Sequence, residues 1–186
     1  AGDMGLFYAA LAGYLLGSLP FAYWFGILQN KNLLEDGSGN VGTTNAWRVL
    51  GPVPGAMVLV LDVAKGILAV ALGEFLAKDA AGGLLAGVLA VWGHCYSVWL
   101  LGKGGKGIAT AVGVLFAVQP VILLVALGIF ALLSLLTRSR SRAASLVALA
   151  LPLVCVAVVP EAGYLWFGFG VGIPAALKNL PDWNRP

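Results

Sequence analysis

Two glycine-rich polar stretches carry the residue types that bind phosphate groups. The first, GSGNVGTTNAWR, covers residues 37–48. Closely spaced glycines let several backbone amides point toward one place, and such a concave set of N–H groups binds anions. Arg48 adds a guanidinium group, which can hold a phosphate through two parallel hydrogen bonds. The stretch therefore predicts a phosphate site, and the alternative is a tight turn whose polar side chains only cap a short helix over 43–50.

The second stretch, GKGGKG, covers residues 102–107 and stands directly before an apolar run. It matches the spacing G-x-G-x-x-G, but no strand-helix-strand unit surrounds it, so a dinucleotide site is not indicated. The underlying physics still applies, because the first amides of a helix that begins near Gly107 attract anions. Lys103 and Lys106 add full positive charges. We expect a second phosphate-binding element here, with a flexible basic loop as the alternative.

Three further residues with ionisable side chains lie inside apolar runs. Asp62 and Lys65 are three residues apart, so on a helix they share one face and can form an ion pair. Ionisable residues within a membrane span usually face an interior cavity or a substrate path; a purely structural ion pair is the alternative. His94 is the only histidine of the chain. It is interpreted first as a structural hydrogen-bond donor and second as a general base.

The rest of the chain consists of the apolar segments that must position these residues. Of 186 residues, 60% are hydrophobic and 10% charged, and the mean hydropathy is +0.95. Because a helix needs about 20 apolar residues to cross about 30 Å of hydrocarbon, this composition excludes a soluble domain and predicts a single all-α, polytopic membrane domain over 1–186. Cys95 and Cys155 fit neither a disulfide framework nor a metal site. Seven transmembrane helices are expected, with six as the fallback: 4–29, 53–77, 82–101, 107–118, 119–136, 143–159 and 162–177.

The charges in the loops predict how these spans are oriented. With seven spans, Lys78 is the only loop lysine or arginine on one side, and all the others fall on the opposite side. Lysine and arginine collect on the cytoplasmic side of membrane proteins. We therefore expect the N-terminus outside, the C-terminus in the cytoplasm, and both glycine-rich stretches at the cytoplasmic face.

At these residues the sequence resembles the bacterial acyl-phosphate:glycerol-3-phosphate acyltransferases, integral membrane enzymes of phospholipid biosynthesis. The resemblance covers most of the chain, and its main motifs follow the family order and spacing. The matching segments are GSLP at 17–20, GSGNVGTTNAWRVLG at 37–51, DVAKG at 62–66, GH at 93–94 and GKGGKGIATAVG at 102–113.

The resemblance implies a seven-helix enzyme of the bacterial inner membrane whose active site faces the cytoplasm. It would move a fatty acyl group from acyl phosphate to the 1-hydroxyl of glycerol 3-phosphate, giving lysophosphatidic acid and phosphate. Ser38, Arg48 and Lys106 would handle the phosphates, with a substrate phosphate taking the proton and His94 and Asp62 as weaker candidates for the base. The predicted substrate-binding residues, from the motifs and from the reasoning above, are Gly37, Gly39, Asn40, Gly42, Thr43, Asn45, Asp62, Lys65, Lys103, Gly104, Gly105, Gly107 and Asn179.

The chain departs from the family pattern at its C-terminal end. The family segment His-x-x-Asn-x-x-Arg is reduced to LKNLPDWNRP, in which Asn179 alone matches, and Ser97 stands where a proline is common.

Besides the two substrates, we expect membrane lipids as partners, no nucleic acid, no metal, no other cofactor and a monomeric enzyme.

Two other functions remain open at this point. A transporter for a phosphorylated metabolite would also use an intramembrane ion pair, but it should contain an internal repeat, and each motif occurs once. A non-catalytic lipid-binding relative would fit the reduced C-terminal segment.

Overall fold

The computed structural model describes residues 2–185, which form helices and contain no β-strand. The all-α architecture is therefore confirmed, and the short helix over 43–50 is present. The elements are α1 (Asp3–Gly17), α2 (Phe21–Leu28), α3 (Thr43–Leu50), α4 (Pro52–Ala77), α5 (Ala80–Cys95), the 3-10 turn η1 (Val98–Leu100), α6 (Ile108–Val118), α7 (Pro120–Thr137), α8 (Arg140–Val158), α9 (Ala162–Asn179) and the 3-10 turn η2 (Leu180–Asp182).

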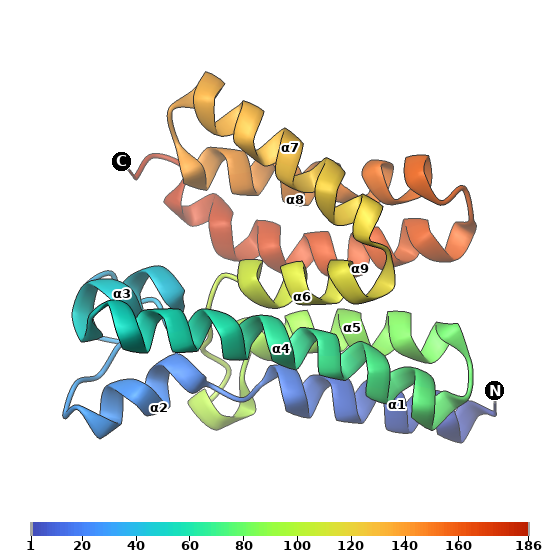
Figure 1. Ribbon diagram of the computed structural model, residues 1–186, viewed down its shortest axis with the longest axis horizontal. Helices are drawn as coiled ribbons and strands as arrows, with labels where there is room; N and C mark the ends of the chain where they lie inside the picture. Colours follow the sequence, from blue (N-terminus) through green and yellow to red (C-terminus); the bar gives the residue numbers. More distant parts are fainter. Residues whose placement is uncertain (1, 186) are drawn as a thin grey trace.

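The long helices run side by side in two groups (Figure 1). In the first group α1, α4 and α5 pack on one another, and α6 lies against α4 and α5. In the second group α8 packs on α7 and α9. Contacts of α5 with α9 and of α6 with α7 join the groups. The two ends of the chain lie at opposite ends of the bundle (Figure 1).

The structure confirms a multi-pass membrane protein. Within residues 2–185, five segments are long and apolar enough to cross a membrane: Asp3–Leu28, Pro52–Ala77, Ala80–Leu100, Pro120–Thr137 and Arg140–Val158. They coincide with five of the expected spans. The other two expected spans are α6, which has only 11 residues, and α9, in which glycines and a polar C-terminal end lower the hydropathy. The count of seven spans therefore stays a prediction.

The first expected span is interrupted where the site forms. α1 ends at Gly17 and α2 begins at Phe21. Proline lacks a backbone N–H and disfavours a helical conformation of the residue before it, so Pro20 accounts for the break at Leu19. The carbonyl group of Leu19 thereby becomes available to a side chain of another helix.

Glycines bring α4 and α6 unusually close together beside the site. A Cβ atom on Gly66 of α4 would lie 2.5 Å from the carbonyl oxygen of Thr110 in α6, and one on Gly113 of α6 would overlap the carbonyl oxygen of Val63. Small residues allow such close approach of backbones in membrane proteins. The spacing of these two helices fixes the distance between the charged residues of α4 and the start of α6.

Candidate active site

The glycine-rich loop before α3 is held in shape by the side chain of Asn45, which is 1% exposed. Its Nδ2 donates to the carbonyl oxygens of Asp36 (3.0 Å) and Asn40 (2.9 Å), and its Oδ1 accepts from the backbone N–H of Ser38 (2.9 Å). Gly37 has φ +62°, and a Cβ there would overlap Oδ1 of Asn45. Asn45 and Gly37 therefore organise the loop rather than offer free groups to a ligand.

The second glycine-rich stretch packs against the end of α5. The backbone N–H of Gly105 donates to the carbonyl oxygen of His94 (3.1 Å), and that of Ser97 donates to the carbonyl oxygen of Lys103 (2.9 Å). A Cβ on Gly105 would overlap Nε2 of His94, so only glycine fits here without a shift. Gly107, with φ +84°, turns the chain into α6. These glycines place Lys106 beside His94 and at the N-terminus of a helix.

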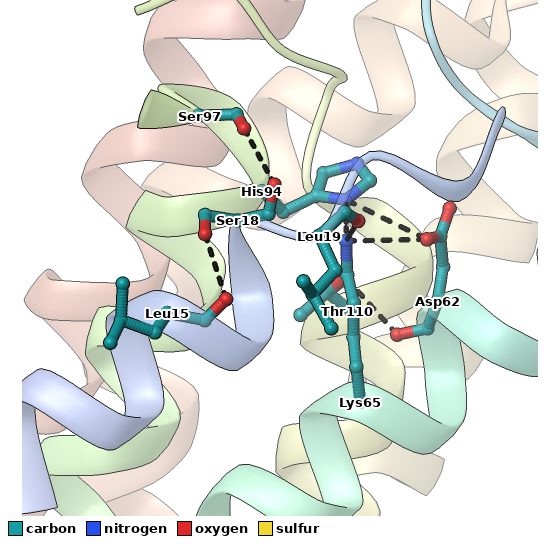
Figure 2. Close-up of polar contacts among 8 residues, drawn as sticks. All are labelled: Leu15, Ser18, Leu19, Asp62, Lys65, His94, Ser97 and Thr110. Carbon is teal, nitrogen blue, oxygen red and sulfur yellow. Dashed lines mark hydrogen bonds and ion pairs between the residues drawn. The ribbon is translucent and has the colours of Figure 1, made fainter. Parts of the chain in front are cut away.

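The charged residues of α4 form a buried polar cluster with α5 and the α1–α2 break (Figure 2). Asp62 and Lys65 are 1% and 3% exposed, and Lys65 Nζ lies 3.3 Å from Asp62 Oδ1, so the predicted ion pair is confirmed. Lys65 Nζ also lies 3.0 Å from the carbonyl oxygen of Leu19 and 2.8 Å from Nδ1 of His94. Thr110 of α6 donates to the backbone carbonyl of Asp62 (3.1 Å). The cluster thus ties α4, α5 and α6 to the break between α1 and α2.

A cavity of about 290 Å³ is bordered by Asp62 and His94 of this cluster. The N-terminal ends of α3 and α6 both border it, through Thr43 and Ile108. Exposed amides at helix N-termini favour anions. The hydroxyl oxygen of Thr43 is buried and has no hydrogen-bond partner within residues 2–185. The full lining is Asn40, Gly42, Thr43, Thr44, Leu59, Asp62, Val63, His94, Lys106, Gly107, Ile108, Ala109 and Val112.

The structure brings together only part of the predicted site. Seven predicted residues line the cavity: Asn40, Gly42, Thr43, Asp62, His94, Lys106 and Gly107. The predicted residues that do not line it are Gly37, Ser38, Gly39, Asn45, Arg48, Lys65, Lys103, Gly104, Gly105 and Asn179.

A neighbouring open cavity of about 350 Å³ holds the predicted Arg48. It is lined by Thr43, Thr44, Trp47, Arg48 and Arg140, so it shares both threonines with the 290 Å³ cavity. In the sequence, Arg140 is one of the loop charges that predict how the spans are oriented. Its side chain faces the same opening as Arg48, which makes this opening strongly basic.

The C-terminal segment closes on Lys106. Lys106 Nζ lies 2.5 Å from Asp182 Oδ2, and Arg185 Nε lies 3.1 Å from Asp182 Oδ1. Asn179 Nδ2 donates to the carbonyl oxygen of Lys106 at 3.3 Å. The side chain of Asn179 thus holds the backbone of the second glycine-rich stretch at Lys106. Sequence reasoning missed Asp182, although it lies in the C-terminal segment that departs from the family pattern.

An apolar groove of about 130 Å³ begins beside the 290 Å³ cavity. The two share Ile108 and Val112 of α6. The groove continues between α6, α7, α8 and α9 along residues such as Ala111, Leu127 and Phe130. The anionic head of a ligand therefore suits the 290 Å³ cavity, and a hydrocarbon chain attached to that head suits the neighbouring apolar groove. Within residues 2–185 no group of three or more His, Cys, Asp or Glu side chains lies close enough to hold a metal ion.

Comparisons with known proteins agree with this arrangement. A family model described as glycerol-3-phosphate acyltransferase matches residues 7–181. Proteins named glycerol-3-phosphate acyltransferase include one from Synechococcus sp. (strain JA-2-3B'a(2-13)), which is 42% identical over 166 residues, covering 89% of this chain and 82% of that protein. Another, from Carboxydothermus hydrogenoformans, is 37% identical over 178 residues, covering 95% and 90%.

A solved structure extends the similarity to the whole fold. The crystal structure of PlsY, described as an integral membrane glycerol 3-phosphate acyltransferase, superposes in its glycerol 3-phosphate form with a TM-score of 0.85 at 31% identity. The match covers 97% of this chain and 90% of that one. Its lysophosphatidic acid form superposes with a TM-score of 0.83. This chain therefore belongs to the glycerol-3-phosphate acyltransferase family.

Proposed function

We propose that the protein transfers a fatty acyl group from an acyl phosphate to the 1-hydroxyl of glycerol 3-phosphate. The observation that carries the proposal is the adjacency of two spaces with different chemistry. The 290 Å³ cavity offers Lys106 and two helix N-termini to phosphate groups, and the apolar groove begins at its edge, at Ile108 and Val112. An acyl phosphate has these two parts in the same order.

The chemistry requires no nucleophile from the protein. An acyl phosphate is an activated mixed anhydride, so the 1-hydroxyl oxygen can attack the acyl carbon directly. The bond between that carbon and the phosphate oxygen breaks, inorganic phosphate leaves, and the hydroxyl proton passes to a phosphate oxygen of a substrate. The protein holds two anionic substrates in reach of each other and stabilises the departing phosphate. Cys95 and Cys155 are both buried, and neither lines this cavity.

The relatives support the choice of acceptor and product. The structures of PlsY that match this fold are described as its glycerol 3-phosphate and lysophosphatidic acid forms. Lysophosphatidic acid is the ester that the proposed reaction forms from glycerol 3-phosphate. We extend both ligands to the cavity bordered by His94 and Lys106 in this chain.

We further propose the inner membrane of a bacterium as the location, with seven spans and the site at the cytoplasmic face. Five candidate spans together with α6 and α9 would make seven, and the chain ends lie at opposite ends of the bundle (Figure 1). Loop lysines and arginines gather near the cavity end, as they do on cytoplasmic sides. We also propose that the enzyme is monomeric.

The test is phosphate release by the purified protein in lipid, supplied with palmitoyl phosphate and glycerol 3-phosphate. We expect release that requires both substrates and that falls on the order of 100-fold in Lys106→Gln, as when one transition-state donor is removed. Lys78→Gln, an exposed lysine at the other end of α4, is the matched control and should keep wild-type activity. A folded wild-type protein that binds glycerol 3-phosphate without releasing phosphate would instead support transport or passive lipid binding.

A further inference from the structure

Lys65 has a complete set of acceptors within the protein. An ammonium group has three N–H donors and no acceptor. Three acceptors surround Nζ: Nδ1 of His94 at 2.8 Å, the carbonyl oxygen of Leu19 at 3.0 Å and Oδ1 of Asp62 at 3.3 Å. Because Lys65 is only 3% exposed and does not line the 290 Å³ cavity, it has no donor left for a substrate.

The contact with Lys65 decides which ring nitrogen of His94 carries the proton. Lys65 can only donate, so Nδ1 of His94 must accept with its lone pair. A neutral imidazole has one N–H group, which is then on Nε2. The opposite tautomer would need an acceptor for Nδ1–H, but Oδ1 of Asp62 lies 4.0 Å from Nδ1, beyond hydrogen-bond distance.

Nε2 is the ring nitrogen that the contact with Lys65 leaves free. Nδ1 points toward Lys65, and Nε2 points away from Lys65 (Figure 2). Nε2 lies against Gly105, in the loop that carries Lys106. His94 and Lys106 border the same 290 Å³ cavity, and Nε2 has no hydrogen-bond partner within the part of the chain that the structure describes.

We propose that Lys65 is a positioning residue that fixes His94 as the Nε2–H tautomer, so that His94 donates a hydrogen bond to an anionic oxygen of the bound substrates. This rests on the proposed function and refines it. With its proton on Nε2, His94 cannot accept the hydroxyl proton of glycerol 3-phosphate at that nitrogen. That proton goes to a substrate phosphate oxygen, and His94 acts with Lys106 as a donor toward the charge on phosphate.

Because His94 is the only histidine, its protonation state can be read directly. The protein is produced with ¹⁵N-labelled histidine and a purification tag that lacks histidine, and ¹⁵N NMR in lipid separates protonated from bare ring nitrogens. We expect a bare Nδ1 and a protonated Nε2 in the wild-type protein. A wild-type protein with Nδ1 protonated would overturn the inference, whatever its activity.

The role of Lys65 is tested by removing its donors. Lys65→Met keeps the length of the side chain, but it leaves Asp62 as an uncompensated buried charge. The double variant Asp62→Leu, Lys65→Met is therefore the better-matched change. In either variant we expect the ring proton to move between both nitrogens, so that the two ¹⁵N signals approach each other. Unchanged signals in the folded variants would show that Lys65 does not set the tautomer.

Kinetics separate a donor from a base at position 94. The side-chain amide of His94→Gln still presents an N–H group but cannot accept a proton, whereas His94→Leu does neither. We expect kcat to fall on the order of 100-fold in His94→Leu and less than about tenfold in His94→Gln. Equal losses in both variants would favour a base and overturn the inference. Failure of the proposed function would look different, because the wild-type protein itself would then release no phosphate.

Discussion

The ion pair between Lys106 and Asp182 places a protein carboxylate where a substrate phosphate is expected. Nζ of Lys106 lies 2.5 Å from Oδ2 of Asp182, and the second carboxylate oxygen is held by Arg185. The side chains of Lys106 and Asp182 are 28% and 11% exposed. A phosphate that approaches Lys106 must therefore share it with Asp182 or displace that carboxylate.

Replacing Asp182 by Asn should strengthen the binding of phosphate groups at Lys106. A partly exposed ion pair contributes about 1 kcal/mol, and this contribution no longer competes with substrate in Asp182→Asn. The expected result is a KM about fivefold lower for at least one of the two substrates, since 1.4 kcal/mol corresponds to a factor of ten. The difference should shrink at about 1 M salt, where the screening length is about 3 Å.

The assay is the initial rate of phosphate release at varied concentrations of each substrate. Arg185→Gln is the control: Arg185 is 62% exposed and touches the other oxygen of Asp182, so its removal leaves the pair with Lys106 intact. We expect KM values within about twofold of wild type in this variant. Unchanged or higher KM values for both substrates in Asp182→Asn would refute the reasoning and would mean that Asp182 only orients Lys106.

Three further predictions follow from the site. Asn45→Ala removes the side chain that holds three backbone groups of the loop before α3, and should lower stability by about 2 to 4 kcal/mol, read as faster thermal inactivation and proteolysis near Gly37. Arg140→Gln should reduce kcat/KM several-fold at low salt and less at high salt, because Arg140 lines the basic opening beside Arg48. Ala111→Trp fills the apolar groove, so activity with palmitoyl phosphate should fall on the order of tenfold while a short-chain acyl phosphate is little affected.

The elements of the fold could be predicted from the sequence because hydrophobic runs and breakers are local signals. α7 begins at Pro120, one residue after the start of the expected span 119–136, and α3 occupies the residues given for the short helix. The expected span 143–159 begins three residues after the observed start of α8 at Arg140. The side chain of Ser139 caps that helix by accepting from the N–H of Arg142, so the helix includes charged residues that hydropathy excludes.

The site could be predicted only as far as its contacts are local. The pairing of Asp62 with Lys65 follows from their spacing on one helix, and it is present. The partners of Lys65 in α5 and at the α1–α2 break are far away in sequence, so no spacing rule indicates them. For the same reason Asp182 gave no signal as the partner of Lys106.

The broken first span explains how so apolar a protein can bury a lysine. Non-helical backbone within a membrane is tolerated where the protein itself satisfies its polar groups, and here two carbonyl groups at the break do find partners. The carbonyl oxygen of Ser18 accepts from the hydroxyl of Ser97 at 2.5 Å, and that of Leu19 accepts from Lys65. Ser97 occupies a position where the family pattern has proline, and a proline there could not donate. The carbonyl group of Leu19, which the break before Pro20 leaves unpaired in its own helix, thus accepts a hydrogen bond from the ammonium group of Lys65. Lys65 therefore needs no substrate to be stable in the bundle.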